Sequence, residues 1–248
     1  MQKFYINIRQ TLTHWRALDH SLLEGFPKDM AEWNEDRGSK LDALARVLKH
    51  HLASDNASPL KINPNGSIVI DDAVAMEERI GIASKKPDKI VVYSFFTHLH
   101  PMIKRVSTSA VYQNRRLTVL LQRLALDGIK TVDINGGMSN AERAKVLDAF
   151  RRGGREDARV LILSIVGLQG LNIADANILV IFDALWSAQE DKQLIGRCHR
   201  KLQVKLVEVY RIVADKTTDI LLNNIAFDKE VVFQAFTGAS EGLSKFPL

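Results

Sequence analysis

The stretch VLILSIVGLQGLNIADANILVIFDALW, residues 160–186, decides the fold of this chain. It is apolar over most of its length, but polar residues interrupt it at Gln169, Asn172, Asp175, Asn177 and Asp183. A membrane-spanning helix needs about 20 predominantly apolar residues in succession, so these interruptions exclude one here. We therefore predict two buried strands, residues 160–163 and 178–182, joined by a loop that contains glycine.

Strands and helices alternate on both sides of this stretch. Short apolar runs predict further strands at residues 90–93, 131–134 and 206–213. Helices are expected at residues 97–125 and 139–150, from residue 187 onward, and at residues 217–236. The strands are apolar almost throughout, as strands buried on both faces are. The sequence thus predicts an α/β fold with a parallel sheet between two layers of helices, preceded by an N-terminal helical extension.

Three segments have the residue types of a helix N-terminus. Ser39-Lys40-Leu41-Asp42 resembles a capping box with Asp in the place of Glu, and it precedes a stripe of leucines at helical spacing, Leu41, Leu44, Leu48 and Leu52. Ser139–Glu142 and Ser187–Glu190 have the full Ser-x-x-Glu pattern. Residues 53–67 are rich in Asn, Ser, Pro and Gly and are expected to form a loop, and residues 68–70 a short strand.

The composition limits the class of protein. Lys and Arg number 34 and Asp and Glu 29, a net charge of +5, which is compatible with nucleic-acid binding. The single cysteine, Cys198, excludes an intramolecular disulfide and a zinc site made of several cysteines, and it fits a reducing compartment. Residues 1–5 lack an apolar core of signal-peptide length, and we expect no contact with a membrane.

The run QLIGRCHR, residues 193–200, contains the strongest functional signal. Gln193, Arg197 and Arg200 stand at positions i, i+4 and i+7, which fall within an arc of roughly 60° on a helix. Two guanidinium groups and a carboxamide on one face suit a polyphosphate, whose charge the arginines neutralise. The alternative is a solvated basic helix face.

Polar loops follow the predicted strands at their carboxyl ends, where ligands bind in open parallel sheets. These loops hold Ser94, Asn135-Gly136-Gly137, residues 164–172 and residues 183–187. Gly167 and Gly170 allow a backbone to approach a phosphate or a ribose closely, although a plain turn explains them equally well.

The order and spacing of these segments resemble the C-terminal RecA-like lobe of the SWI/SNF-type chromatin-remodelling ATPases, DNA translocases of helicase superfamily two. Residues 89–94 resemble motif IV of that lobe, residues 164–172 motif V and residues 193–200 motif VI, with Gln203 three residues beyond. The similarity covers residues 37–236 and implies a RecA-like lobe at residues 39–236, an insertion at 53–88, an extension or linker at 1–38 and a tail at 237–248. Departures include Ser187-Ala188 for Asn-Pro, Leu168 and Leu202 for glycines, and Asn135 for Asp.

The resemblance implies a role for each motif residue. Arg197 and Arg200 are expected as arginine fingers on the γ-phosphate of ATP bound with Mg²⁺, and Gln193 as a link to the opposite lobe. Gly170, Asn172 and Gly196 are expected at the nucleotide or at the interface between lobes. The residues expected to face DNA are Ser94, Asn135, Gly136, Arg143, Ser164 and Trp186. For Trp186 a buried position is the alternative.

The phosphate-binding loop of the first lobe needs a Gly-Lys pair, and its magnesium site an acidic pair. The chain contains no Gly-Lys dipeptide and no Asp-Glu dipeptide. We therefore expect it not to hydrolyse ATP alone but to act with an N-terminal RecA-like lobe on double-stranded DNA or nucleosomes, in the nucleus.

The sequence also admits other functions, and purely structural explanations for several single residues. The chain could be a degenerate helicase-like module that acts in binding or dimerisation, as a homodimer, or the lobe of an RNA helicase. His98 and His100 could bind a metal or form a surface pair, and Cys198 could be redox-sensitive or a buried thiol. The arginines between Arg151 and Arg159 could hold phosphate or form a solvated turn.

Overall fold

A computed structural model describes residues 8, 11–13, 29–35, 37–62, 67–71, 86–94, 127–135, 137–164, 170–183, 185, 187–201, 203–221 and 223–224. The expected helix at residues 97–125, His98, His100, Gly136, Gly167, Leu168, Trp186, Leu202 and residues 237–248 lie outside these ranges, as does most of the expected helix at 217–236. Among the helices that the structure describes, none combines the length and the apolar character that crossing a membrane requires.

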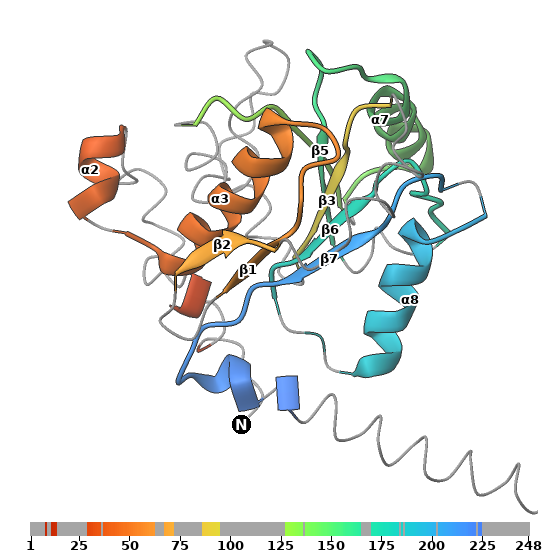
Figure 1. Cartoon of the computed structure of the whole chain (residues 1–248). Helices are drawn as coiled ribbons and strands as arrows, with labels where there is room; N and C mark the ends of the chain where they lie inside the picture. The colour runs from red at the N-terminus through yellow and green to blue at the C-terminus, as the bar shows by residue number, and fades with distance from the viewer. Residues whose placement is uncertain are drawn as a thin grey trace, which may run out of the picture.

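A five-stranded parallel sheet forms the centre of the molecule (Figure 1). Its strands, in spatial order, are β4 (Thr131–Ile134), β5 (Val160–Leu163), β3 (Ile90–Tyr93), β6 (Ile178–Ile181) and β7 (Glu208–Arg211). Ile90 of the central strand pairs with Val160 on one side and with Ile178 on the other, so these three strands begin level with one another. The five predicted strands are confirmed, although β6 ends one residue before the predicted 178–182 and β7 is shorter than the predicted 206–213.

Helices cover both faces of the sheet (Figure 1). Helix α3 (Ser39–Ala53) packs its leucines against alternate residues of the strands, such as Ile90 and Val92. Helices α7 (Asn140–Arg152) and α8 (Ala188–Cys198) pack against the intervening residues, such as Val91 and Tyr93. Successive side chains of a strand point to opposite faces, so an apolar strand needs both layers. The predicted α/β/α fold is confirmed.

The helix starts match the sequence in two of three cases. Ser139 forms a full capping box with Glu142, and Ser187 accepts a hydrogen bond from the Glu190 amide at 3.3 Å. The prediction for Ser39 is wrong, because Gly38 is the N-cap and makes no side-chain capping bond. Asp42, which the capping box required, instead accepts hydrogen bonds from Trp33 Nε1 at 2.9 Å and from Arg37 Nε at 3.0 Å.

A small antiparallel hairpin precedes the sheet. Strand β1 (Leu60–Ile62) pairs with β2 (Ile68–Ile70), which confirms the predicted strand at residues 68–70. The prediction of a loop over residues 53–67 is wrong at β1, and its start, residue 53, is the last residue of α3. Before α3, helix α2 (Met30–Glu35) buries Trp33 in the core of the α3 face.

Candidate functional site

Helix α8 presents the predicted polar face. Its core side is fixed by Leu194 and Cys198, which are fully buried against the sheet. On the other side Gln193 and Arg200 are exposed, and Arg197 is half-buried. Gln193 and Arg197 therefore lie on the outward side of α8, as their spacing predicts. Arg200 follows the C-cap His199 and is outside the helix, so the predicted common helical face is wrong for this residue.

Neither arginine forms an ion pair with a carboxylate in the part of the chain that the structure describes. Among the described residues, Arg200 Nε donates to Gly196 O of α8, four residues earlier, at 3.3 Å. The nearest acidic residues of α8 lie in its first turn, where Asp191 pairs with Arg211. The carboxyl end of α8 carries a partial negative charge from the helix dipole, which favours cations. This partial charge is too small to compensate the two guanidinium groups of Arg197 and Arg200.

Gly196 lies directly before Arg197 and four residues before Arg200. It is exposed, and a Cβ added to it meets no heavy atom within 4 Å of the described chain. Glycine inside a helix costs about 1 kcal/mol relative to alanine, and nothing in the described residues requires it here. The face is thus open to a close approach from outside.

The arginine end of α8 lies at the amino edge of the sheet, meaning the edge where the strands begin. Ile173, which precedes β6, donates its amide to Arg197 O at 3.2 Å. Gln203 Nε2 donates to the carbonyls of Ala174 and Ala176, at 2.9 and 2.8 Å. Helix α8 starts at the carboxyl end of β6 and returns along the sheet, so the sequence-based expectation that the ligand edge is the carboxyl edge does not apply to these arginines.

Asn172 and Gly170 lie on the approach to the same edge. Asn172 is half-buried, and its side-chain oxygen accepts a hydrogen bond from the Ala174 amide at 3.3 Å. Gly170 is exposed and has a φ of 76°, in the left-handed region that glycine tolerates. Of the predicted nucleotide-binding residues, Gly196 and Asn172 therefore lie near the arginine end of α8, since Asn172 precedes the Ile173 that bonds to Arg197 O.

The carboxyl edge holds a second, mostly buried polar group. Ser94 and Asp183 are buried and joined by a hydrogen bond from Ser94 Oγ to Asp183 Oδ2 at 2.7 Å. Ser164 is buried too, and its Oγ has no partner among the described residues. Ser94 and Ser164, both predicted to face DNA, are therefore buried rather than on the surface in this structure.

Asn135 and Arg143 stand near the capped start of α7, at this carboxyl edge. Both are half-buried. Asn135 donates to Asp133 Oδ2 at 2.8 Å and accepts from the Gly137 amide at 2.9 Å, which shapes the turn before Ser139. Among the residues predicted to face DNA that the structure describes, Asn135 and Arg143 are partly accessible, whereas Ser94 and Ser164 are buried.

Three basic residues at the end of α7 and just beyond it form ion pairs with carboxylates of the same chain. Arg152 pairs with Asp148, while Arg155 and Arg159 both pair with Asp55. Cys198 is fully buried, and desolvation raises the pKa of its thiol to about 12, which favours the interpretation as a structural thiol.

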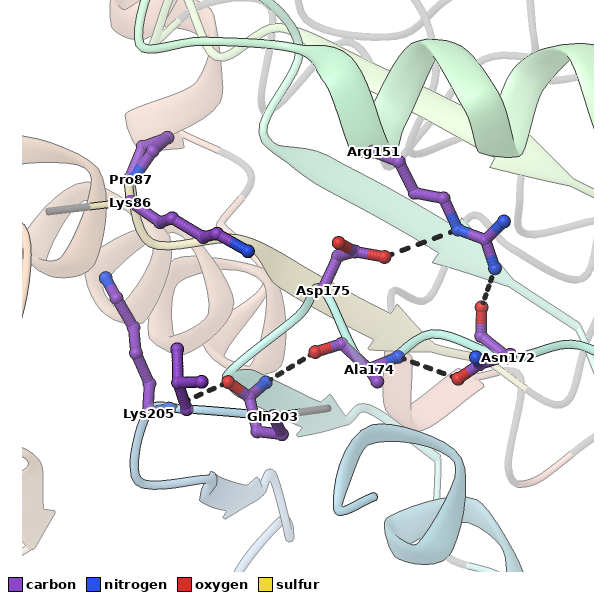
Figure 2. A pocket seen from close by; sticks show the side chains of 9 residues that line it. Lys86, Pro87, Arg151, Asn172, Ala174, Asp175, Gln203 and Lys205 are labelled. Carbon is purple, nitrogen blue, oxygen red and sulfur yellow. Dashed lines mark hydrogen bonds and ion pairs between the residues drawn. The ribbon is translucent and has the colours of Figure 1, made fainter. Parts of the chain in front are cut away.

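A pocket of about 410 Å³ opens at the amino edge (Figure 2). Its lining includes Arg151, Asn172, Asp175, Gln203 and Lys205. The polar groups there bind one another or, in the case of Lys205 Nζ, the buried Asp88 at 2.6 Å. The sequence analysis did not assign Arg151 or Asp183 to the site. It gave Arg151 only as one of several arginines that could hold phosphate, and Asp183 only as part of the polar loop after the strand at residues 178–182.

Comparison with known families decides the identity of the fold. The model of the family described as "Helicase conserved C-terminal domain" matches residues 74–201, which is more than half of the chain. The chain belongs to this helicase C-terminal domain family. The match includes β3 to β6 and all of α8, so both edges of the candidate site lie on the helicase domain.

Relatives of this helicase domain are chromatin-remodelling proteins. "Protein CHROMATIN REMODELING 5" of Arabidopsis thaliana is 32% identical over 105 residues, which are 42% of this chain and 6% of that protein. The "Probable chromatin-remodeling complex ATPase chain" of Oryza sativa subsp. japonica is 28% identical over 210 residues, 82% of this chain and 17% of that protein. The chain thus spans a small part of each relative. The predicted resemblance to the SWI/SNF-type lobe is confirmed.

A solved structure has the same fold as this helicase domain. The "Crystal structure of the C-terminal part of Fun30 ATPase domain" aligns with a TM-score of 0.54 at 20% identity, covering 79% of this chain and 46% of that one. Together with the five parallel strands, this similarity confirms the RecA-like fold.

Proposed function

We propose that this helicase domain is the C-terminal lobe of an ATP-dependent double-stranded-DNA translocase of the SWI/SNF type. Its task is to supply Arg197 and Arg200 to ATP that is bound mainly by a first RecA-like lobe. The observation that carries the proposal is the carboxyl end of α8, where Gly196, with open space at its Cβ position, is followed by two arginines without carboxylate partners among the described residues.

Charge is the first support for this role. A guanidinium without an internal counter-ion remains available for an incoming anion, and phosphoryl transfer spreads negative charge over the γ-phosphate oxygens. Two arginines three residues apart at a helix end can contact that group together. Gln193, one turn earlier on the same face, is suited to bind a polar group of the first lobe.

The gap at Gly196 is the second support. A first lobe that carries ATP must approach α8 closely enough for the arginines to reach the γ-phosphate. A side chain at residue 196, next to Arg197 and four residues before Arg200, would limit how closely that lobe can approach. In this proposal Gly170 and Asn172 would lie beside the nucleotide or the lobe interface.

DNA binding belongs to the carboxyl edge in this proposal. Arg143 and Asn135, near the start of α7, would contact the phosphate backbone together with Gly136 and Trp186. Ser94 contributes by binding Asp183 between two strand ends, and neither Ser94 nor Ser164 is exposed to DNA in this structure. Nucleosomal DNA in the nucleus is the proposed substrate, because the relatives are named for chromatin remodelling.

Hydrolysis requires the partner lobe. The Mg²⁺ ion and the β- and γ-phosphates need a phosphate-binding loop and an acidic pair, and neither sequence occurs in this chain. When ATP is bound, the present residues neutralise charge and exclude water at the closing interface. The isolated chain is expected to have no ATPase activity.

The test is DNA-stimulated ATP hydrolysis by an ATPase in which this lobe follows a first lobe. We expect Arg200→Ala and Arg197→Ala to lower kcat by about 10³- to 10⁵-fold, the range measured for arginine fingers. Arg152→Ala is the control, because Arg152 is an exposed arginine that pairs with Asp148 on α7. Undiminished turnover in Arg200→Ala, with the fold checked by circular dichroism, would overturn the assignment.

A further inference from the structure

Residues 172–176 form a short segment that contacts α7 on one side and the arginine end of α8 on the other. We name it the bridging segment. Figure 2 shows its contacts with Arg151. From α7, Arg151 Nη2 donates to Asn172 O at 2.5 Å, and Arg151 Nε pairs with Asp175 Oδ2 at 3.3 Å. One guanidinium therefore holds both the backbone and a side chain of the segment.

The opposite side of the bridging segment contacts the arginine helix itself. The Ile173 amide donates to Arg197 O at 3.2 Å. This carbonyl is among the last four of α8, which lack a donor within the helix, so the bridging segment supplies its partner. Gln203 holds the same segment from beyond the helix end, through the carbonyls of Ala174 and Ala176.

The α7 end of this arrangement is anchored to the centre of the sheet. Lys89, just before β3, is buried and donates from Nζ to Phe150 O and Arg151 O, at 2.6 and 2.5 Å. The backbone of Arg151 is thereby fixed to the central strand, and its side chain reaches across to the bridging segment. A change at Arg151 must alter how firmly that segment, and with it Arg197 O, is held relative to the sheet.

We propose that Arg151 is a positioning residue for Arg197, an inference that rests on the proposed function of α8. Arg151 touches neither nucleotide nor DNA in this role. It sets the location of the arginine end of α8 through the bridging segment. Arginine is required because its planar group binds a carbonyl and a carboxylate at once, whereas the point charge of a lysine makes fewer such contacts.

The structural half of the test uses the 248-residue chain alone and follows hydrogen exchange of the Ile173 amide by NMR. In Arg151→Met we expect this amide to exchange about tenfold faster or more, since the segment loses a hydrogen bond to a charged group. Arg152→Met is the matched control, because Arg152 is the next residue of α7, is exposed and pairs with Asp148 among the described residues. Amides of β3 and β5 should keep wild-type rates in both variants, which verifies the fold.

Arg151→Lys should give intermediate exchange at Ile173. An Ile173 amide that exchanges at the wild-type rate in Arg151→Met, or that is accelerated equally by Arg152→Met, would overturn the positioning role. This outcome leaves the proposed function untouched, because no nucleotide is present.

The functional half uses the ATPase that contains this lobe, with Arg197→Ala measured alongside. We expect Arg151→Met to lower kcat about tenfold while the KM for ATP changes less than about twofold, because a misplaced finger affects the transition state more than binding. Arg151→Lys should recover part of kcat. If Arg197→Ala loses turnover and Arg151→Met keeps it, the positioning role is wrong and the proposed function stands. If Arg197→Ala keeps turnover, the proposed function is wrong and the positioning role fails with it.

Discussion

Replacing Gly196 with alanine should stabilise the isolated chain and impair the assembled ATPase. Gly196 lies within α8, outside the left-handed region, and an added Cβ meets no heavy atom within 4 Å of the described chain. Alanine is favoured over glycine inside a helix by about 0.8–1.0 kcal/mol. Because residue 196 is close to the end of α8, we expect the free energy of unfolding to rise by about 0.5–1 kcal/mol. For a chain of this size the melting temperature should rise by about 2–4 °C.

The same methyl group stands where the proposed first lobe approaches. DNA-stimulated ATP turnover should therefore fall, by about 10²-fold if the lobes are displaced by about 1 Å. Gain of stability with loss of activity separates an interface role from a folding role. The assays are thermal and urea denaturation of the isolated chain, followed by circular dichroism, and steady-state turnover of the ATPase.

Gly170→Ala is the matched control for this prediction. A Cβ on Gly170 also meets open space, but its φ of 76° imposes strain on alanine, so the chain should lose about 1–2 kcal/mol of stability. If Gly196→Ala destabilises the chain, the reasoning about free space at α8 is refuted. If Gly196→Ala leaves turnover unchanged, no partner approaches this face closely.

Two further predictions concern buried groups near α8. Burial raises the pKa of the Cys198 thiol to about 12, so this thiol should resist alkylation at pH 8 in the folded chain and react rapidly in urea. Mass spectrometry measures both rates, and equal rates would contradict the burial of Cys198. Lys205→Met leaves the Asp88 carboxylate buried without its cation, so the free energy of unfolding should fall by about 3–5 kcal/mol. Arg152→Met, which breaks an exposed ion pair, should lower it by less than about 1 kcal/mol. Similar losses for the two variants in urea denaturation would refute this difference.

The main elements of the fold could be predicted because local and tertiary preferences agree in them. Residues 90–93, 131–134 and 160–163 were predicted as strands with the observed bounds, since a run of buried apolar residues admits few other arrangements. Strand β1 was missed because its three residues depend on pairing with β2 and on a hydrogen bond from the Leu60 amide to Tyr210 Oη, 150 positions away in the sequence.

The cap of α3 shows the opposite situation, in which a valid local pattern lost to tertiary contacts. Ser39 and Asp42 have suitable types and spacing for a capping box. In the structure Trp33 is buried against α3, and its indole N–H needs an acceptor, which Asp42 provides. The sequence contains no short-range sign of this competition.

By itself the sequence determined the parallel sheet, the two helical layers and the outward side of α8 that Gln193 and Arg197 share, because strand and helix periodicity act over neighbouring residues. Only the tertiary structure decided at which edge of the sheet the arginines lie and that Arg151 reaches Asn172. These features join residues from separate turns of the chain, and their positions depend on how helices of particular lengths return across the sheet.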